Sequence, residues 1–173
     1  MIHVYADMVA DLFHYGHVAF LKAARAMGDY LIVGVMSDDE AADGKRPPIL
    51  TVEERVAVVA ACCYVDEAIP NAPWRIDADW IVKHSIDLIV HGDDFSEQEL
   101  NYFYSVPIAM GIFRTVSYTP GISTTDIILR CKAAHMGSKR SPSSARQVLQ
   151  QRQAQETEAE NSSSGNIRLT KDR

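Results

Sequence analysis

Apolar and polar positions alternate with two different periods along the first 135 residues. Uninterrupted apolar runs are typical of buried parallel strands, and here they alternate with segments whose apolar residues have helical spacing. Strands are expected at 2–7, 30–36, 65–69, 88–91 and 112–117, and helices at 15–27, 52–63, 77–84, 97–104 and 123–135. The polar segment 37–50 contains one Gly and two Pro residues, so it is expected to be a loop.

Several ends of these elements carry recognisable signals. Thr51 precedes a helix and Glu54 stands three residues later, which is the pattern of a capping box. Asp77 is expected to cap the next helix. Gly28 is expected to end the first helix as a C-cap, and Pro70 is expected to end the third strand.

The alternation of strands and helices predicts an α/β fold, a Rossmann-like, doubly wound parallel sheet with helices on both faces. Ligands of such sheets bind beyond the carboxyl ends of the strands, where the strand order changes direction. Three turns follow expected strands: His-Tyr-Gly-His at 14–17, Gly-Asp-Asp at 92–94 and Gly-Ile-Ser-Thr-Thr at 121–125. They are therefore expected to meet at one edge of the sheet.

The composition changes after residue 135. Residues 136–173 are dominated by Ser, Gln, Glu and Arg, which predicts a disordered tail after a single domain of residues 1–135. The formal net charge is −6 and the acidic excess lies in that domain, which argues against a nucleic-acid partner. An apolar run of about 18 residues is absent, and the tail has no apolar face for a membrane. Three cysteines form neither a disulfide framework nor a metal quartet, which indicates a cytoplasmic protein.

Two motifs carry the candidate chemistry. His14 and His17 flank Gly16 at the start of one expected helix, and Ser123 and Thr124 stand at the start of another. The first N–H groups of a helix have no partner within the helix, and the helix dipole is positive there, so anions bind at this end. Both motifs therefore predict contacts to phosphate groups.

The chain resembles the cytidylyltransferases that activate phosphoethanolamine, phosphocholine and glycerol 3-phosphate. The resemblance is carried by the segments 5–17, 26–35, 64–74 and 121–125, which occur in order within residues 1–132. It implies that a phosphate oxygen of the acceptor attacks the α-phosphorus of CTP and that pyrophosphate leaves. It further implies a Mg²⁺ ion that is held mainly by the phosphates of CTP, and it assigns no residue of the protein as a metal ligand. A homodimer with residues 64–67 at its two-fold interface is also implied.

The resemblance assigns roles to individual residues. For catalysis these are His14, His17, Lys45, Ser123 and Thr124, with Lys45 in a flexible loop that closes over the phosphates. For CTP they are Asp7, Asp11, Gly16, Gly92, Asp94, Gly121 and Ile122. Of these, Asp94 suits the amino group of cytosine, and Asp11 is expected to brace the histidine turn. For the acceptor they are Arg55, Trp74, Arg75, Arg114 and Tyr118, where Trp74 offers an aromatic face to a trimethylammonium group.

Two positions depart from the family pattern and keep alternatives open. Cys63 and Tyr118 stand where the family has cations that face phosphates, and the arginines at 46, 55, 75 and 114 are the candidates to replace them. A phosphonate acceptor from a natural-product pathway is therefore a second prediction. A catalytically weak, nucleotide-binding regulatory protein is a third, and adenylyl transfer from ATP is a fourth. The histidines at 3, 84, 91 and 135 are expected to be structural.

Overall fold

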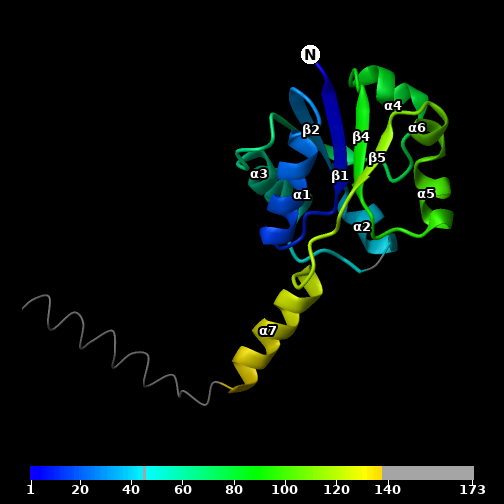
Figure 1. The fold of residues 1–173 in the computed structure, drawn as a ribbon. Helices are drawn as coiled ribbons and strands as arrows, with labels where there is room; N and C mark the ends of the chain where they lie inside the picture. The colour runs from blue at the N-terminus through cyan, green and yellow to red at the C-terminus, as the bar shows by residue number, and fades with distance from the viewer. Residues whose placement is uncertain (45, 138–173) are drawn as a thin grey trace, which may run out of the picture. The chain divides into compact units, whose positions relative to one another are not determined.

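The fold is built on one five-stranded parallel sheet. The computed structural model describes residues 1–44 and 46–137. The strands are β1 (His3–Met8), β2 (Tyr30–Met36), β3 (Glu67–Ala72), β4 (Leu88–Gly92) and β5 (Phe113–Val116). Their order across the sheet is β3-β2-β1-β4-β5, and every neighbouring pair is parallel (Figure 1). The predicted α/β, Rossmann-like class is confirmed.

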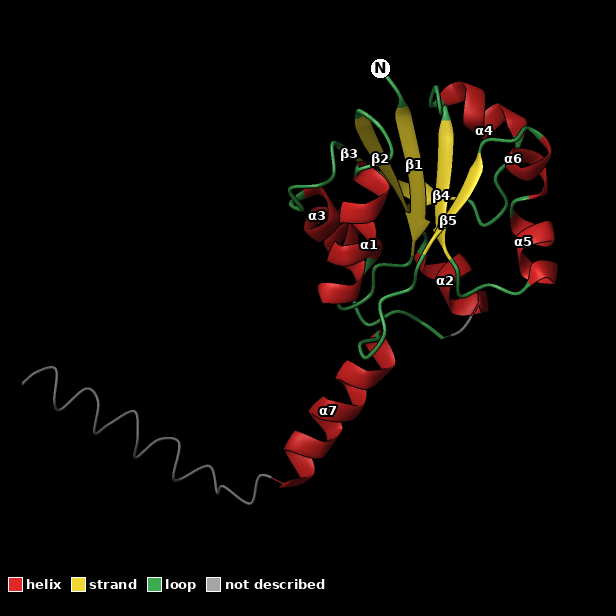
Figure 2. Cartoon of the chain, in the orientation of Figure 1, coloured by secondary structure: helices red, strands yellow, loops and turns green. Residues whose placement is uncertain are grey.

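Helices cover both faces of the sheet. The helices in the described part of the chain are α1 (Tyr15–Arg25), α2 (Asp38–Gly44), α3 (Val52–Ala60), α4 (Ala78–Lys83), α5 (Glu97–Phe103), α6 (Ser105–Ala109) and α7 (Thr124–Gly137). Figure 2 shows α1 and α3 on one side of the strands and α4, α5 and α6 on the other. Successive side chains of a strand point to opposite faces, so Val4 packs against α1 while Tyr5 packs against Ile81 of α4. Each face therefore has its own apolar core.

The strand order determines where the sheet leaves a crevice for a ligand. The chain starts at β1 in the middle of the sheet, moves outward through β2 to β3, and then returns to β4 on the other side of β1. Connections that leave β1 and β4 run in opposite directions, which leaves a crevice at the carboxyl ends of these two strands. The turns that follow β1 and β4 line that crevice.

One predicted loop is in fact helical. Residues 38–44 form α2, where the sequence predicted a loop. The side chain of Ser37 accepts a hydrogen bond from the amide of Glu40 at 3.2 Å, which caps the helix. Acidic residues fill the first turn, where they complement the helix dipole, and Ala41 is buried against the protein. Ser37 was a sequence signal for the start of this helix, but the Gly and Pro residues that follow favoured the prediction of a loop.

Gly28 and Pro70 were predicted to end a helix and a strand, and the structure gives each residue a different role. Helix α1 ends at Arg25, and Gly28 is a point of close packing: a Cβ atom there would lie 2.5 Å from a methyl group of Val4. Strand β3 continues through Pro70 to Ala72. It is an edge strand, where a missing N–H is tolerated, and its pairing with β2 shifts register near Asn71, whose φ is 56°.

The remaining helix signals agree well with the structure. Thr51 and Glu54 form the reciprocal capping box of α3, and Asp77 caps α4 by accepting from the amide of Trp80 at 2.8 Å. Helix α3 ends earlier than expected, with Ala61 as its C-cap. The expected helix 97–104 ends at Phe103, and a separate short helix, α6, follows it.

The contacts divide the chain into two compact units, Met1–Leu129 and Arg130–Arg173. The predicted boundary at 135/136 lies within α7, a few residues beyond this division. The predicted tail lies almost entirely outside the described residues. Within the described part of the chain, no helix is long and apolar enough to cross a bilayer.

Candidate functional site

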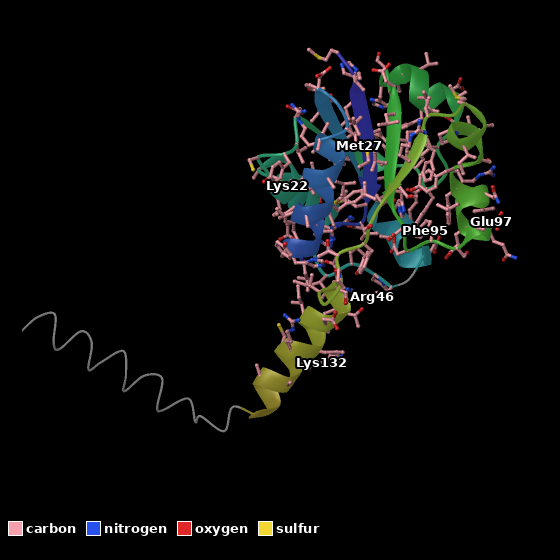
Figure 3. All side chains as sticks on the ribbon, in the orientation of Figure 1. Lys22, Met27, Arg46, Phe95, Glu97 and Lys132 are labelled. Carbon is pink, nitrogen blue, oxygen red and sulfur yellow. The ribbon has the colours of Figure 1, made fainter. Side chains whose placement is uncertain are left out.

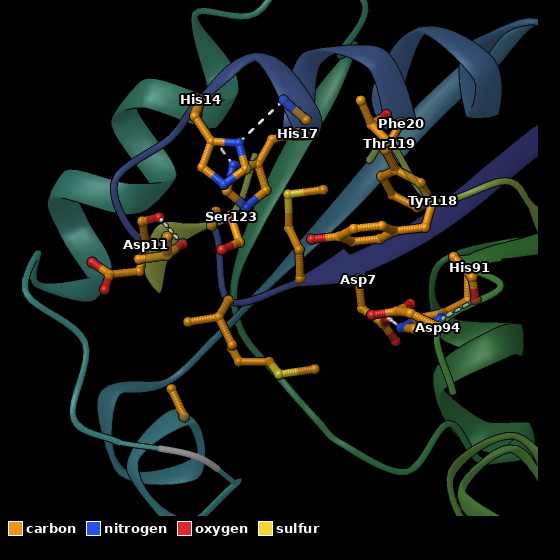
Figure 4. A pocket seen from close by; sticks show the side chains of 18 of the residues that line it. Asp7, Asp11, His14, His17, Phe20, His91, Asp94, Tyr118, Thr119 and Ser123 are labelled. Carbon is orange, nitrogen blue, oxygen red and sulfur yellow. Dashed lines mark hydrogen bonds and ion pairs between the residues drawn. The ribbon is translucent and has the colours of Figure 1, made fainter. Parts of the chain in front are cut away.

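A cavity of about 300 Å³ opens at the carboxyl ends of β1, β4 and β5. Eleven of the residues predicted for the site line it: Asp7, Asp11, His14, Gly16, His17, Trp74, Gly92, Asp94, Tyr118, Ser123 and Thr124. The structure thus brings together residues that lie more than a hundred positions apart in the sequence. Figure 4 shows His14, His17 and Ser123 on one side of the cavity, and Asp7, His91 and Asp94 on the other. These groups are called the histidine side and the carboxylate side below.

The two histidines of the histidine side cap the helix that carries them. His14 is the N-cap of α1, and its Nδ1 accepts a hydrogen bond from the amide of Gly16 at 3.1 Å. The Nδ1 of His17 accepts from the amide of His14 at 3.1 Å. A neutral imidazole carries its proton on the nitrogen that does not accept, so both rings carry it on Nε2. The turn therefore supplies two Nε2–H donors.

Both rings are held in the neutral form. Burial lowers the pKa of His14, and the nearby carboxylate of Asp126 opposes this shift. Burial and then the adjacent His14 lower the pKa of His17 to about 4. The first turn of α1 contains no acidic side chain, so nothing in that turn neutralises the positive end of the helix dipole. An anion that binds here meets fixed donors and a favourable dipole.

Glycines allow the two turns to approach one another. A Cβ atom at Gly16 would lie 3.0 Å from the ring of His14 and 3.3 Å from a methyl group of Ile122. Gly121 has a φ of 81°, which other residues rarely adopt. Gly121 and Ile122 are not among the residues that line the cavity, so they shape the turn behind it.

Asp11 connects three segments around the histidine side. Its Oδ1 accepts from the amides of Ile49 and Leu50 at 3.0 and 3.1 Å, and its Oδ2 accepts from Arg46 at 2.9 Å. Its backbone carbonyl accepts from the hydroxyl of Thr124 at 2.9 Å. The carboxylate therefore braces the segment after α2, whereas the sequence assigned it to bracing the histidine turn.

Ser123 acts as a helix cap. Its hydroxyl accepts from the amide of Asp126 at 3.1 Å and donates to the carboxylate of the same residue at 2.7 Å. Its carbonyl also accepts from the amide of Ile127, as expected at the start of a helix. The hydroxyl lines the cavity while it performs this structural role.

The carboxylate side is acidic and aromatic. Asp7 is 3% exposed, and its Oδ1 accepts from the hydroxyl of Tyr104 at 2.6 Å. Its Oδ2 is buried and has no hydrogen-bond partner in the described part of the chain. Burial raises the pKa of Asp7, and the nearby His91 and the Tyr104 hydrogen bond oppose this shift. Asp7 lines the cavity, and a buried carboxylate oxygen without a partner favours a cation nearby.

His91 packs among the aromatic rings of this side. Its Nδ1 lies 2.9 Å from the carbonyl of Gly92, so this nitrogen carries the proton, and its Nε2 lies 4.0 Å from Oδ1 of Asp7. The centroid of its ring is 4.3 Å from that of Phe95. A Cβ atom at Gly92 would lie 2.7 Å from the carboxylate of Asp94, so the turn brings that carboxylate close to the backbone.

Tyr118 and Trp74 form two further walls. In Figure 4 the ring of Tyr118 lies between the histidine side and the carboxylate side. Its amide donates to Asp93 at 2.7 Å, and its side chain is half-exposed. Trp74 donates from Nε1 to the carbonyl of Glu40 at 2.9 Å, and a Cβ atom at Gly44 would lie 2.5 Å from its ring. Helix α2 therefore holds this ring at the cavity wall.

Three predicted acceptor-binding arginines lie elsewhere. Arg55 is completely buried and donates to the carbonyls of Leu50 and Val9 and to the carboxylate of Asp38. The guanidinium of Arg75 covers the ring of Tyr102, and Arg114 donates to neighbouring backbone carbonyls. None of the three lines the cavity. Lys45, predicted to close over the phosphates, lies outside the described residues.

Of the cavity residues that the predicted site did not include, two carry titratable side chains, His91 and Arg46. His91 was expected to be structural, yet it lines the cavity at the end of β4. Its position at the carboxyl end of a predicted strand was a usable signal. Arg46 was named only as one of four arginines that could compensate for lost cations, and it alone of the four lines the cavity. Nothing in the sequence distinguished it from the other three.

The fold is an α/β fold, and its cavity lies at the carboxyl edge of the parallel sheet, beside the start of α1. A family model described as cytidylyltransferase-like matches residues 7–130. The chain therefore belongs to the cytidylyltransferase-like family, which confirms the resemblance found in the sequence.

Similar proteins include enzymes named for two phosphorylated amines. The chain is 45% identical over 139 residues to the ethanolamine-phosphate cytidylyltransferase of Arabidopsis thaliana, which covers 76% of this chain and 33% of that protein. It is 39% identical over 132 residues to the choline-phosphate cytidylyltransferase A of Rattus norvegicus, covering 75% and 36%. The chain thus spans about a third of the length of these relatives.

A solved structure shares the fold. The lipopolysaccharide core biosynthesis protein from Thermoplasma volcanium GSS1 matches with a TM-score of 0.57 and 30% sequence identity. The match covers 69% of this chain and 98% of that one.

Proposed function

We propose that this protein transfers CMP from CTP to a small phosphorylated amine, such as phosphoethanolamine or phosphocholine, and releases pyrophosphate. The observation that carries the proposal is the division of the cavity. One side presents two neutral Nε2–H donors at a helix start, and the other presents a buried carboxylate oxygen without a partner. The substrates require both, because a triphosphate is anionic and the acceptor has a cationic end.

The proposed reaction is a single displacement at phosphorus. A phosphate oxygen of the acceptor forms a bond to the α-phosphorus of CTP, and the bond between that phosphorus and the bridging oxygen to the β-phosphate breaks. His14 and His17 donate from Nε2 to the phosphate oxygens, which gain negative charge in the transition state. Because both rings are already neutral and fixed, they do not need to reorganise during the reaction. We place Ser123 and Thr124 beside the β- and γ-phosphates. Each hydroxyl has one proton, which Ser123 now donates to Asp126 and Thr124 to the carbonyl of Asp11, so each must turn before it can donate to a phosphate.

The carboxylate side would bind the base and the amine. Asp94 is an acceptor suited to the amino group of cytosine. The sequence assigned Asp7 to CTP, but we assign it to the acceptor, because its buried Oδ2 has no partner in the described residues and is suited to an ammonium group. Trp74 and Phe95 are aromatic walls nearby. A cation at this point would offset the cost of burying the Asp7 charge. This favours an acceptor with an amine over glycerol 3-phosphate.

We place Mg²⁺ on the phosphates of CTP. Within the described residues, no group of three or more His, Cys, Asp or Glu side chains is gathered in a way that could hold a metal ion. A phosphate-bound Mg²⁺ needs few protein ligands, and it would supply charge neutralisation of the triphosphate.

We also propose a homodimer with residues 64–67 at its interface. The Asp66 carboxylate at this point accepts from the amide of Leu31 at 2.8 Å and pairs with Arg25 at 3.1 Å, so the segment is well fixed. Light scattering on the whole chain should give twice the 19.2 kDa monomer mass. The monomer mass at micromolar concentration would refute the dimer.

A phosphonate acceptor is the second candidate. The observation that favours it is the scarcity of cations at the cavity, where Tyr118 offers a neutral phenol. A compact phosphonate with an amine would still satisfy Asp7. The two acceptor classes share the reaction at the α-phosphorus and differ only in the group that attacks.

The test is pyrophosphate release from each of the four nucleoside triphosphates with phosphoethanolamine, phosphocholine, glycerol 3-phosphate and 2-aminoethylphosphonate. The proposal expects release with CTP and a phosphorylated amine, with kcat/KM of about 10⁴ M⁻¹s⁻¹ or above. Release with the phosphonate alone would favour the second candidate. Release with ATP alone would indicate an adenylyltransferase. Binding of CTP without turnover of any acceptor would indicate a regulatory protein.

A further inference from the structure

The cavity is poor in positive charge for a site that would hold two phosphate-containing substrates. Its described lining includes the carboxylates of Asp7, Asp11 and Asp94. Arg46 is the one lysine or arginine among the same lining residues. Both histidines are neutral, so they contribute donors without a full charge. A phosphate dianion that leaves water needs charge-assisted hydrogen bonds, and Arg46 is placed to give them.

The guanidinium of Arg46 is held in position and keeps free donors. Its Nη2 donates to Oδ2 of Asp11 at 2.9 Å, and its Nη1 donates to the carbonyl of Pro47 at 3.1 Å. A guanidinium has five N–H donors in a planar arrangement, so at least three remain available. The side chain is 38% exposed, and Figure 3 shows it at the carboxyl end of the sheet.

The partner of Arg46 is itself fixed. The carboxylate of Asp11 is 5% exposed and also accepts from two backbone amides, so it stays in place when Arg46 binds a ligand. The carbonyl of Asp11 accepts from Thr124, which lines the same cavity. The guanidinium is thereby held near the start of α7 without having to be ordered by the ligand, which reduces the entropic cost of binding.

The position of Arg46 in the chain indicates which phosphate it binds. Arg46 follows α2, whose Gly44 packs against the Trp74 ring on the cavity wall. Arg46 therefore lies between the Trp74 wall and the Asp11–Thr124 contact. We propose that Arg46 binds the phosphoryl or phosphonyl group of the acceptor and determines its affinity. This inference rests on the proposed function, because it assumes that CTP occupies the histidine side.

The test uses Arg46→Gln, Arg46→Lys and, as a matched control, Lys22→Gln on the exposed face of α1. For each whole-chain protein, the KM for phosphoethanolamine and the KM for CTP are measured separately. Calorimetry then measures the binding of inorganic phosphate and of CTP. Arg46→Gln should raise the KM for phosphoethanolamine about 10- to 100-fold, the size of one or two lost charge-assisted contacts. The KM for CTP should change less than about twofold, whereas the dissociation constant of inorganic phosphate should rise by about 10- to 100-fold, as the acceptor KM does.

Arg46→Lys keeps the charge and the pairing to Asp11, so it should lose less than the Gln variant and should control for misfolding. Lys22→Gln should match the wild type. A raised KM for CTP with an unchanged acceptor KM would overturn the assignment, and so would unchanged values for both. A wild type that turns over no acceptor would refute the proposed function instead. The calorimetric difference between wild type and Arg46→Gln would then still decide whether Arg46 binds phosphate.

Discussion

The histidine side and the carboxylate side of the cavity are built on opposite principles. On the histidine side, each polar atom that caps α1 or α7 already has a partner, and the rings are neutral by burial. On the carboxylate side, a buried oxygen of Asp7 has no partner in the described residues. We infer that the two histidines can bind an anion without reorganisation, and that a cation would satisfy the oxygen of Asp7 that has no partner. This difference is our reason for placing the triphosphate on the first side and the cationic end of the acceptor on the second.

The largest expected effect comes from breaking the histidine side. His14→Ala or His17→Ala should lower kcat by about 10²-fold or more, the size of losing a donor to the transition state. Steady-state kinetics of pyrophosphate release measure this. His135→Ala, an exposed histidine outside the cavity, is the matched control and should be neutral. Wild-type turnover in both purified variants would remove the histidines from the mechanism.

A second effect concerns stability rather than rate. The ordinary pKa of a histidine is 6.5, and that of His17 is lowered to about 4, so the unfolded chain binds a proton in this window and the folded chain does not. The contribution of His17 to the free energy of unfolding is therefore fully present above pH 6.5, and it is lost as the pH falls towards 4. The loss attributable to His17 between pH 7 and pH 5 is about 2 kcal/mol.

Chemical denaturation at pH 7 and pH 5 measures this loss. His17→Gln, whose amide oxygen can still accept from the amide of His14, should lose correspondingly less stability over the same interval. The pKa values of His14 and His84 are also lowered, so the variant should keep part of the dependence of stability on pH. An identical loss in both proteins would show that His17 is not neutral by burial.

A smaller effect would sharpen the choice of acceptor. Cys63→Arg combined with Tyr118→Arg restores the family's cations and should shift the preference towards phosphocholine and glycerol 3-phosphate by about tenfold, roughly one charge-assisted contact. The ratio of kcat/KM values for the phosphate esters and 2-aminoethylphosphonate measures the shift. A wild type that already uses phosphocholine at typical enzyme rates would make the two substitutions silent.

The smallest expected effect is that of removing residues beyond Gly137. The polar composition of this segment predicts no contribution to a packed site, so truncation should change kcat and soluble yield less than about twofold. Vesicles of anionic phospholipid should not stimulate the full chain. A large stimulation that disappears on truncation would overturn this prediction.

The sequence predicted the parts of the fold that depend on local pattern. Apolar runs predicted β2 and β4, where buried parallel strands tolerate few polar residues, and alternation predicted β1. The edge strand β3 carries polar residues and lies two to three residues later than the predicted 65–69. The His14–His17 spacing specified the helix start. Helix α2 was missed because one capping serine was outweighed by the Gly and Pro residues after it. The arginines could not be placed, because a buried Arg55 and a cavity-lining Arg46 differ only in long-range contacts. Those contacts are set by packing, which local pattern does not encode.

We expect the carboxylate side to bind the cationic end of the acceptor through Asp7. The most direct test compares kcat/KM for phosphoethanolamine and for propyl phosphate, which replaces the ammonium by a methyl group, in wild type and in Asp7→Asn. The Asn variant keeps an oxygen for the Tyr104 hydroxyl and removes only the charge. We expect the wild type to prefer phosphoethanolamine by at least about tenfold in kcat/KM, because one hydrogen bond to a charged group contributes about that much. In Asp7→Asn the two kcat/KM values should be nearly equal. An unchanged preference in Asp7→Asn would contradict this role of Asp7.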